Sequence, residues 1–177
     1  MVKRPYAPGN KGKRRRGRGK SEYGQELAEK QKLKNWYGLS ERQFKKYVRE
    51  SLRAKDATAS LLSRLESRLD NIVFRLGLVS SRKLARQLVN HGFFLVNNKS
   101  SWAPSRALKK GDQIKLKPEK TKKKILASFL VNLKRQKLPA WLKFDEAHFE
   151  AEVVETPTIA ASDLPAEASA IFEFYSR

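Results

Sequence analysis

Apolar residues between positions 61 and 76 recur at steps of three and four, which is the spacing of one face of an α-helix. The residues on this face are Leu61, Leu62, Leu65, Leu69, Ile72, Val73 and Leu76. Gly77 follows directly and is the residue type that most easily ends a helix in a left-handed conformation. The pattern predicts one long amphipathic helix that ends at Gly77, with a turn over residues 56–60 before it.

A second helical pattern follows, with Ser80 or Ser81 as its N-cap and Gly92 as its terminator after His91. Its apolar face holds Leu84, Leu88 and His91, with Ala85 and Val89 beside them. Another face holds Arg82, Arg86 and Asn90. Two helices that pack through leucine and valine would leave such polar faces, together with Arg64, Arg68 and Arg75 on one edge of the first helix, open to a ligand.

Two helices are also predicted upstream. One covers residues 21–37 and ends at Gly38, and the next begins at Ser40, which forms a capping-box pattern with Gln43, and continues to about Ala54. The second of these has an apolar stripe of Phe44, Tyr47, Val48 and Leu52. Its other side carries Arg42, Lys45, Lys46, Arg49 and Arg53. A face of one sign repels itself without a counter-charge, so we expect RNA contact there; an ordinary solvated face is the alternative.

Downstream, short strands alternate with turns. The expected strands cover residues 93–96, 113–117, 141–144, 149–154 and 171–175, and a further helix covers residues 120–137. Asn97 and Asn98 suit a tight turn because asparagine tolerates positive φ, and Gly111 with Asp112 marks another. An acidic connection, interrupted by proline, precedes the last strand.

These elements predict an α+β protein in which a mainly helical N-terminal part packs on a mixed domain with a small antiparallel sheet. We divide the chain into a basic extended arm (1–20), a helical region (21–66), a mixed domain (67–130) and an acidic C-terminal segment (131–177) that packs on the same body. Glycine, proline and cations dominate the arm, so we expect it to lack a core of its own.

Charge identifies the class of partner. The 177 residues carry a formal net charge of +21, which predicts an anionic polymer, with nucleic acid favoured over a membrane surface. Residues 1–20 hold nine Lys/Arg and no acid, whereas residues 145–177 hold eight Asp/Glu and one Arg. A polyanion should therefore meet the arm and the middle and avoid the C-terminal end. There is no secretory signal and no apolar run long enough to span a bilayer, so no membrane partner is expected.

Catalytic, metal and cofactor sites are not predicted. The chain has no cysteine, which removes thiolate zinc sites and cysteine nucleophiles, and a reducing cytoplasm fits this composition. Its two histidines, His91 and His148, have no metal-ligand spacing to other donors, and no glycine-rich phosphate loop follows a strand.

Phosphate recognition is the chemistry that the sequence does support. Arginine grips phosphate through a planar fork, and the amides of Asn71, Gln87, Asn90 and Asn97 can reach 2′-hydroxyls and base edges. The aromatic residues Tyr23, Trp36, Tyr37 and Phe44 could stack on bases, although their helical spacing favours core packing.

The segments RLDNIVFRLG, SSRKLARQLVNHG, LVNN and KKGDQIKL together resemble the alpha-L RNA-binding motif, a helix–helix–strand unit. The flanking YGQELAEKQKLKNWYGLSERQF and the closing IFEFYSR resemble the bacterial-type S4 family of small-subunit ribosomal proteins. The resemblance covers roughly residues 20–177.

The resemblance implies a primary binder of small-subunit rRNA that docks on a multi-helix junction of the 5′ domain and nucleates subunit assembly. It also implies small-subunit proteins five and three as neighbours, a position near the channel by which mRNA enters, and an influence on translational accuracy. A cytoplasmic ribosome is expected, and an organellar ribosome is the alternative that the sequence leaves open.

Together, the residues and the resemblance give one set of candidate RNA-binding positions. They are Arg14, Arg15, Arg16, Arg18, Lys32, Arg42, Lys45, Lys46, Arg49, Arg53, Arg68, Asn71, Arg75, Ser81, Arg82, Lys83, Arg86, Gln87, Asn90, His91, Asn97 and Arg106.

The chain departs from the family pattern in two places. Many members begin with about forty further residues, sometimes with a cysteine zinc site, so we expect a short form without that region and without zinc. Asn98 stands where the family often has glycine.

Two other functions remain open from the sequence. An RNA-modifying enzyme can use the same motif, but it would need an additional catalytic domain. A non-ribosomal RNA-binding factor, such as a free ribosome-rescue protein, would use the motif without being a structural part of the subunit.

Overall fold

The computed structural model describes residues 21–120, 129, 138–145, 148–158 and 164–176. The helices are α1 (Glu22–Trp36), α2 (Glu41–Ser51), α3 (Ala57–Glu66), α4 (Leu69–Arg75), α5 (Arg82–Asn90), the 3₁₀ turn η1 (Pro118–Lys120) and α7 (Ala168–Ser176). The strands are β1 (Phe94–Val96), β2 (Lys99–Ser100), β3 (Gln113–Leu116), β4 (Leu142–Asp145) and β5 (Glu150–Val153). The expected α+β class is confirmed.

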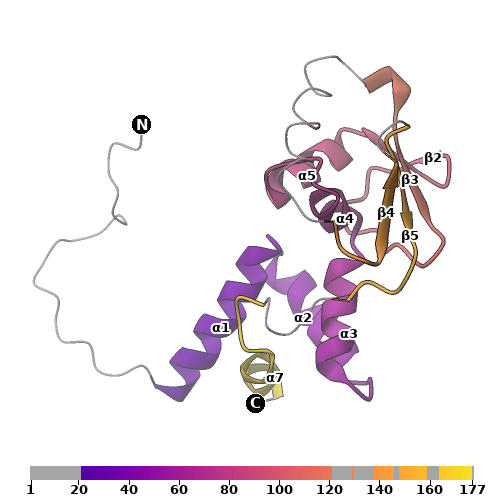
Figure 1. Cartoon of the computed structure of the whole chain (residues 1–177). Helices are drawn as coiled ribbons and strands as arrows, with labels where there is room; N and C mark the ends of the chain where they lie inside the picture. The colour runs from indigo at the N-terminus through magenta and orange to yellow at the C-terminus, as the bar shows by residue number, and fades with distance from the viewer. Residues whose placement is uncertain (1–20, 121–128, 130–137, 146–147, 159–163, 177) are drawn as a thin grey trace, which may run out of the picture.

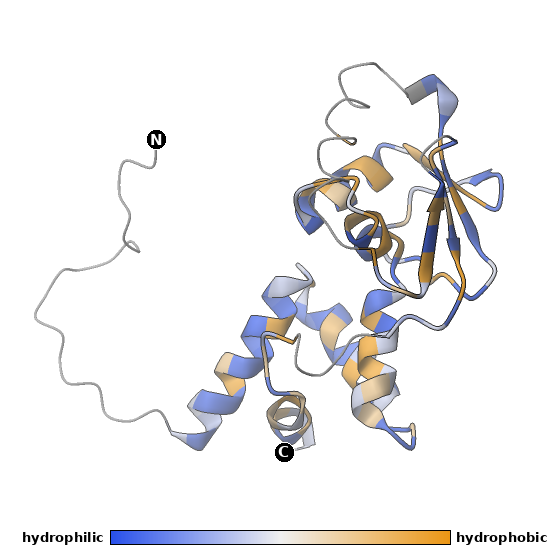
Figure 2. Ribbon diagram, viewed as in Figure 1, coloured by the Kyte–Doolittle hydropathy of each residue, from blue (hydrophilic) through white to orange (hydrophobic). Residues whose placement is uncertain are grey.

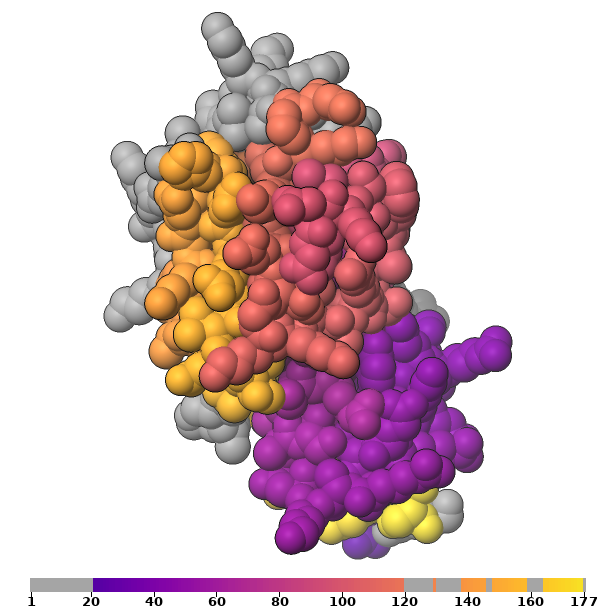
Figure 3. Space-filling view, turned by 90° about the vertical axis from the view of Figure 1, so that its right-hand side faces the viewer, coloured from indigo at the N-terminus to yellow at the C-terminus, as the bar shows by residue number. Residues whose placement is uncertain are grey.

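Two hydrophobic cores organise these elements. The smaller core joins α1, α2, α3 and α7 through buried residues such as Leu33, Phe44 and Leu65, and these helices form the lower body in Figure 1. The larger core joins α4 and α5 to the sheet, and these elements form the upper body in Figure 1; Figure 2 shows the apolar residues gathered along them. Figure 3 shows the two bodies in direct contact, with the last residues of the chain (yellow) on the lower body beside the first helices (indigo).

The sheet is antiparallel throughout, with the strand order β2-β1-β3-β5-β4. Along each inner strand every second residue is buried, as Ile114 and Leu116 are in β3. Asn97 and Asn98 have φ values of 50° and 60°, which confirms the turn expected between β1 and the next segment. That segment is β2, a two-residue strand that the sequence pattern did not predict.

The single long helix expected up to Gly77 is wrong. The helix is interrupted at Ser67 and Arg68. There Arg68 forms an isolated β-bridge with Ala107, and Ser67 O accepts a hydrogen bond from Leu108 N at 2.8 Å. Apolar residues on both sides of the break face cores, so the three–four spacing continues through it. The predicted turn over residues 56–60 is also wrong, because Asp56 is the N-cap of α3 and accepts from Ala59 N at 2.9 Å.

The last predicted strand, over residues 171–175, is a helix instead. Ile171 and Tyr175 stand four residues apart and therefore share one face of α7, which packs against α1. Ile171 is completely buried in the smaller core, and Tyr175 Oη donates to Glu41 Oε1 at 2.6 Å. Tertiary packing thus overrides an alternating pattern that is typical of a strand.

Several local signals are confirmed. Ser40 and Ser81 are the N-caps of α2 and α5, and Gly38 and Gly92 have the positive φ values expected of helix terminators. The helix predicted over residues 120–137 lies almost entirely outside the described residues; within it, Phe129 is buried in the larger core.

Some predicted core positions are exposed. Leu52 is 45% exposed because α2 ends at Ser51, and Leu84 is 37% exposed because α5 buries Ala85 and Val89 instead. His91, which was placed on the same apolar face, is also exposed.

Replacing Ile171 with alanine tests whether α7 completes the smaller core. We expect the free energy of unfolding to fall by about 2–5 kcal/mol, because a fully buried side chain is truncated and a cavity remains. Urea denaturation measures this change. Glu173→Ala on the exposed side of the same helix is the control and should change stability by less than about 0.5 kcal/mol. Equal effects of the two substitutions on the free energy of unfolding would contradict the conclusion that Ile171 of α7 completes the smaller core.

Candidate nucleic-acid interface

A buried carboxylate, Glu66, lies where the two bodies meet. Its oxygens accept hydrogen bonds from Tyr37 Oη at 2.6 Å, from Asn71 Nδ2 at 2.8 Å, and from Arg75 Nε and Nη2, each at 2.8 Å. Burial alone would raise the pKa of Glu66. The hydrogen bonds and positive charge of Arg75, together with the hydrogen bonds from Tyr37 and Asn71, outweigh burial and hold the pKa below its ordinary value. Burial and the charge of Glu66 raise the pKa of Tyr37, which therefore stays protonated as a donor.

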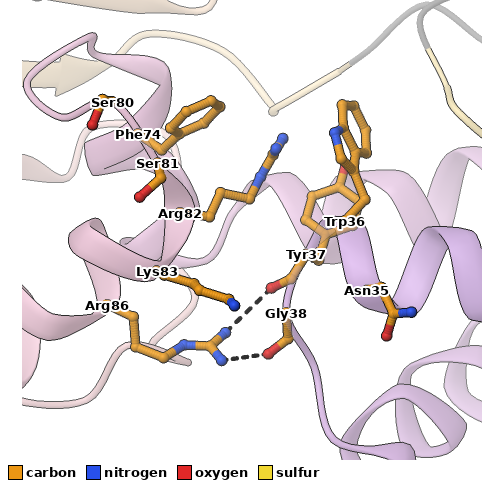
Figure 4. Close-up of a pocket in the computed structure, with 10 residues that line it drawn as sticks. All are labelled: Asn35, Trp36, Tyr37, Gly38, Phe74, Ser80, Ser81, Arg82, Lys83 and Arg86. Carbon is orange, nitrogen blue, oxygen red and sulfur yellow. Dashed lines mark hydrogen bonds between the residues drawn. The ribbon is translucent and has the colours of Figure 1, made fainter. Parts of the chain in front are cut away.

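A second carboxylate, Asp70, joins the same junction from the first turn of α4. Arg68 and Arg86 both bond it, with Nη2 of each guanidinium 2.8 Å from Asp70 Oδ2. Arg86 also donates to the carbonyl oxygens of Tyr37 and Gly38, so it links α5 to the end of α1 (Figure 4). The polar junction, as we call Tyr37, Glu66, Arg68, Asp70, Asn71, Arg75 and Arg86, therefore connects α1, α3, α4 and α5.

This arrangement corrects one expectation about the cations. Arg68 and Asn71 are each only 2% exposed, so neither faces outward as the helical pattern predicted. The reason is the break in the helix at Ser67 and Arg68, which turns Arg68 back onto Asp70 and onto Tyr47 Oη at 2.8 Å. Arg75, which was expected on an open edge, is committed to Glu66.

Arg82 lies at the edge of the polar junction and is held by aromatic rings. Its guanidinium carbon is 4.3 Å from the Trp36 ring centroid and 4.4 Å from that of Phe74, and its Nε donates to Asn71 Oδ1 at 2.8 Å. Burial lowers the pKa of Arg82 from its very high ordinary value. Figure 4 shows the side chain reaching between Phe74 and Trp36. These residues line a cleft with a volume of about 460 Å³.

The cations of α2, with Arg53 just after its end, form an open positive surface. Arg42, Lys45, Lys46, Arg49 and Arg53 are all exposed and, with Ser40, Gln43 and Glu50, line a shallow groove. Lys46 lies 3.9 Å from Glu50, whereas the other four make no ion pair within the described ranges. We call these five cations the α2 basic row; their charge is available to an external anion.

The remaining candidates differ in how free they are. Lys83, Gln87, Asn90 and His91 are exposed on α5 or directly after it, and Arg106 is half-buried. Lys32 is paired with Glu29 at 2.6 Å, Ser81 caps α5, and Asn97 is engaged in its turn through Asp112 and Gln113. Arg14, Arg15, Arg16 and Arg18 lie outside the described residues.

The aromatic residues divide between the two roles considered for them. Tyr37 and Phe44 are core residues, and Tyr23 is exposed but lies 5.4 Å from Phe174, centroid to centroid. Trp36 is partly exposed and lines the cleft, together with Asn35 and Ser80, neither of which the sequence indicated as an RNA-binding residue. Asn35 and Ser80 come together only when the end of α1 and the start of α5 meet in the folded chain, so no periodic pattern in the sequence could have identified them.

No group of three His, Asp or Glu residues among those described could hold a metal ion. None of the described helices combines the length and apolarity needed to cross a membrane.

Comparison with known proteins gives matches along the whole chain. Residues 1–67 match the family described as Ribosomal protein S4/S9 N-terminal domain, and residues 67–114 match the S4 domain. The chain is 43% identical to small ribosomal subunit protein uS4A of Bdellovibrio bacteriovorus, over 99% of this chain and 84% of that protein. It is 41% identical to uS4 of Syntrophobacter fumaroxidans, over 100% and 85%, and 37% identical to uS4 of Thermotoga maritima, over 99% and 84%.

Glu66→Gln tests the polar junction through its pH dependence. Because the pKa of Glu66 is lower in the folded than in the unfolded chain, its contribution is complete above the unfolded value of about 4.3 and is lost as the pH falls through the folded value. Urea denaturation at pH 7 should show a loss of about 3–5 kcal/mol, because Arg75 loses its buried partner. The loss should shrink at pH 3.

The control for this experiment is Glu119→Gln, because the Glu119 side chain is 77% exposed. We expect it to change stability by less than about 0.5 kcal/mol at either pH. A Glu66→Gln penalty that is unchanged between pH 7 and pH 3 would show that the carboxylate charge does not stabilise the junction.

Proposed function

The chain belongs to the uS4 family of small ribosomal subunit proteins, and on this premise we propose how it binds rRNA and what it does in the subunit. As a family member it is a structural constituent of the small ribosomal subunit, resides in the ribosome, binds RNA through its S4 domain and is not an enzyme. The proposal concerns which RNA it meets, through which residues, and with what consequence.

We assign the primary RNA contact to two surfaces that the polar junction holds in a fixed relation. One is the α2 basic row on the lower body; the other is the exposed edge of α5, with Lys83, Gln87 and Asn90. Arg86, which bonds Asp70 and the carbonyl of Gly38, ties these two bodies together. Two surfaces held in one relation, one cationic and one that combines a lysine with two amides, suit a multi-helix junction of the rRNA 5′ domain, where neighbouring RNA helices diverge.

The chemistry divides between affinity and recognition of shape. Exposed arginines and lysines bind phosphate oxygens and release counterions, which makes the affinity depend steeply on salt. The amides of Gln87 and Asn90 reach 2′-hydroxyls and base edges, which bulges and junctions present more openly than a regular duplex does. Because the protein surfaces are already ordered, binding would fix the RNA helices in one arrangement, which is the step that nucleates subunit assembly.

The acidic surface suits protein neighbours better than RNA. Residues Glu22, Glu29, Glu167 and Glu173 of α1, α7 and the segment before α7 line a groove on the lower body. Such a surface repels RNA and fits a basic protein, so we assign it to contact with small-subunit proteins five or three, near the channel by which mRNA enters. Accuracy of translation would depend on that contact.

Sedimentation distinguishes a structural constituent from a free factor. A tagged form of the chain, expressed in cells in place of the resident protein, should co-sediment with small subunits and remain bound after a high-salt wash. Complete release by the wash, with the subunits intact, would favour the non-ribosomal alternative.

Neutralising part of the α2 basic row should weaken RNA binding in a salt-dependent way. For Arg42→Gln, Lys45→Gln and Arg49→Gln combined, we expect the slope of log K against log[salt] for a 5′-domain rRNA fragment to become shallower by about 2–3, since each lost phosphate contact contributes about 0.9. Filter binding over a salt series measures the slope.

The matched control removes the same net charge elsewhere, through Lys109→Gln, Lys110→Gln and Lys143→Gln, all exposed positions of the upper body. Its slope should stay close to that of the unaltered protein. Equal changes in the two triple variants would show that net charge, rather than the α2 basic row, governs the affinity.

A further inference from the structure

A cleft between the end of α1 and the start of α5 has features that a general phosphate-binding surface does not need. Its lining combines an indole, a phenyl ring and three cations, and among the described residues every charged one that lines it is basic. Its volume of about 460 Å³ falls within the usual range for small-molecule sites, roughly 300–1,000 Å³. A cation-lined surface alone would hold phosphates without enclosing anything.

Arg82 is the polar group that indicates what the cleft binds. Trp36 and Phe74 enclose the faces of its guanidinium, and Asn71 takes its Nε–H (Figure 4). Its Nη2 is buried and has no hydrogen-bond partner among the described residues. A buried donor without a partner destabilises the protein, so an acceptor from outside the chain would satisfy it. Because the rings block both faces, that acceptor must approach in the guanidinium plane.

The N-terminal turn of α5 supplies a second anchor at the same cleft. Ser80, Ser81 and Lys83 line it, and Ser81 Oγ already caps the amide of Leu84 at 3.3 Å. The preceding amides of a helix have no intrahelical partner, and the positive end of the helix dipole favours an anion. A phosphate there would lie close to the Lys83 ammonium group.

We propose that this cleft binds a single nucleotide turned out of the rRNA, with its base stacked on Trp36, a base acceptor bonded to Arg82, and its phosphate at the first turn of α5. The inference rests on the proposed rRNA-binding function and adds a specific subsite to it. The two other features of the cleft fit this ligand: an aromatic ring, Trp36, for a base, and the Lys83 ammonium group for the attached phosphate. Turning a nucleotide out is least costly where it is already unpaired, as at a junction.

Tryptophan fluorescence tests the stacking directly. In a Trp102→Phe background the remaining indoles are Trp36 and Trp141, and Trp141 is only 4% exposed, with its Nε1 bonded to Thr158 O. Addition of the 5′-domain rRNA fragment should quench the emission. Trp36→Phe in the same background keeps a ring against Arg82, should still bind the RNA, and should lose most of the quenching. Equal quenching with and without Trp36 would overturn the stacking.

Chemical probing of the bound RNA separates the two levels of the proposal. With the unaltered full chain, the Watson–Crick edge of one unpaired nucleotide should be protected, and Trp36→Ala should restore its reactivity and weaken binding by about 5- to 150-fold. Arg82→Lys keeps the charge but not the planar fork, and should also restore reactivity.

The outcomes of probing are distinguishable. Protection of phosphates near the α2 basic row, with identical base reactivity in all three proteins, would remove the nucleotide subsite and leave the proposed function intact. Absence of any binding by the unaltered chain would instead remove the proposed function. Urea denaturation of Trp36→Ala and Arg82→Lys identifies loss of folding, and Trp36→Phe then carries the test alone.

Discussion

The rest of this structure depends on the hydrogen bonds and the ion pair that the buried carboxylate of Glu66 forms. It lies at the end of α3 and binds a tyrosine from α1 and an arginine and an asparagine from α4. Removing one partner of such a buried pair typically costs about 3–5 kcal/mol, because the other is left charged and unsolvated. Asp70 repeats the arrangement one helix later with Arg68 and Arg86. The hydrogen bonds and ion pairs of these two carboxylates join the parts of the fold that hold the two hydrophobic cores.

Among the described residues, two groups of cations have different tasks. Arg68, Arg75 and Arg86 neutralise internal carboxylates and fix how the bodies sit, whereas the α2 basic row keeps its charge for an external anion. A rigid relation between the bodies matters for RNA recognition, because the RNA sets the distances between its phosphates. A protein with a loose hinge would lose affinity through the conformational entropy lost when its bodies become ordered. The internal arginines therefore serve binding indirectly, through geometry.

The acidic C-terminal segment has a similar double role in folding. Its strands β4 and β5 extend the sheet of the upper body, while α7 returns to the lower body and packs on α1. Ile171 fills the smaller core, and Tyr175 reaches Glu41 at the start of α2. The end of the chain thus completes the body formed by its beginning. Two of its carboxylates, Glu167 and Glu173, line a groove with glutamates of α1, and this groove is distinct from the one that the α2 basic row lines.

The sequence alone determined the class of fold, the type of partner and many local elements. Caps and terminators such as Ser40, Ser81 and Gly92 act through their own backbone and nearest neighbours, so short-range chemistry is sufficient to predict them. Only the tertiary structure decided the break at Arg68, the helical state of residues 171–175, and which cations are internal. Each of these depends on groups distant in sequence: Ala107 for Arg68, α1 for α7, and Asp70 for Arg86. Helical periodicity predicts the face of a helix on which a polar residue lies. The group that its side chain contacts is determined only when the chain folds.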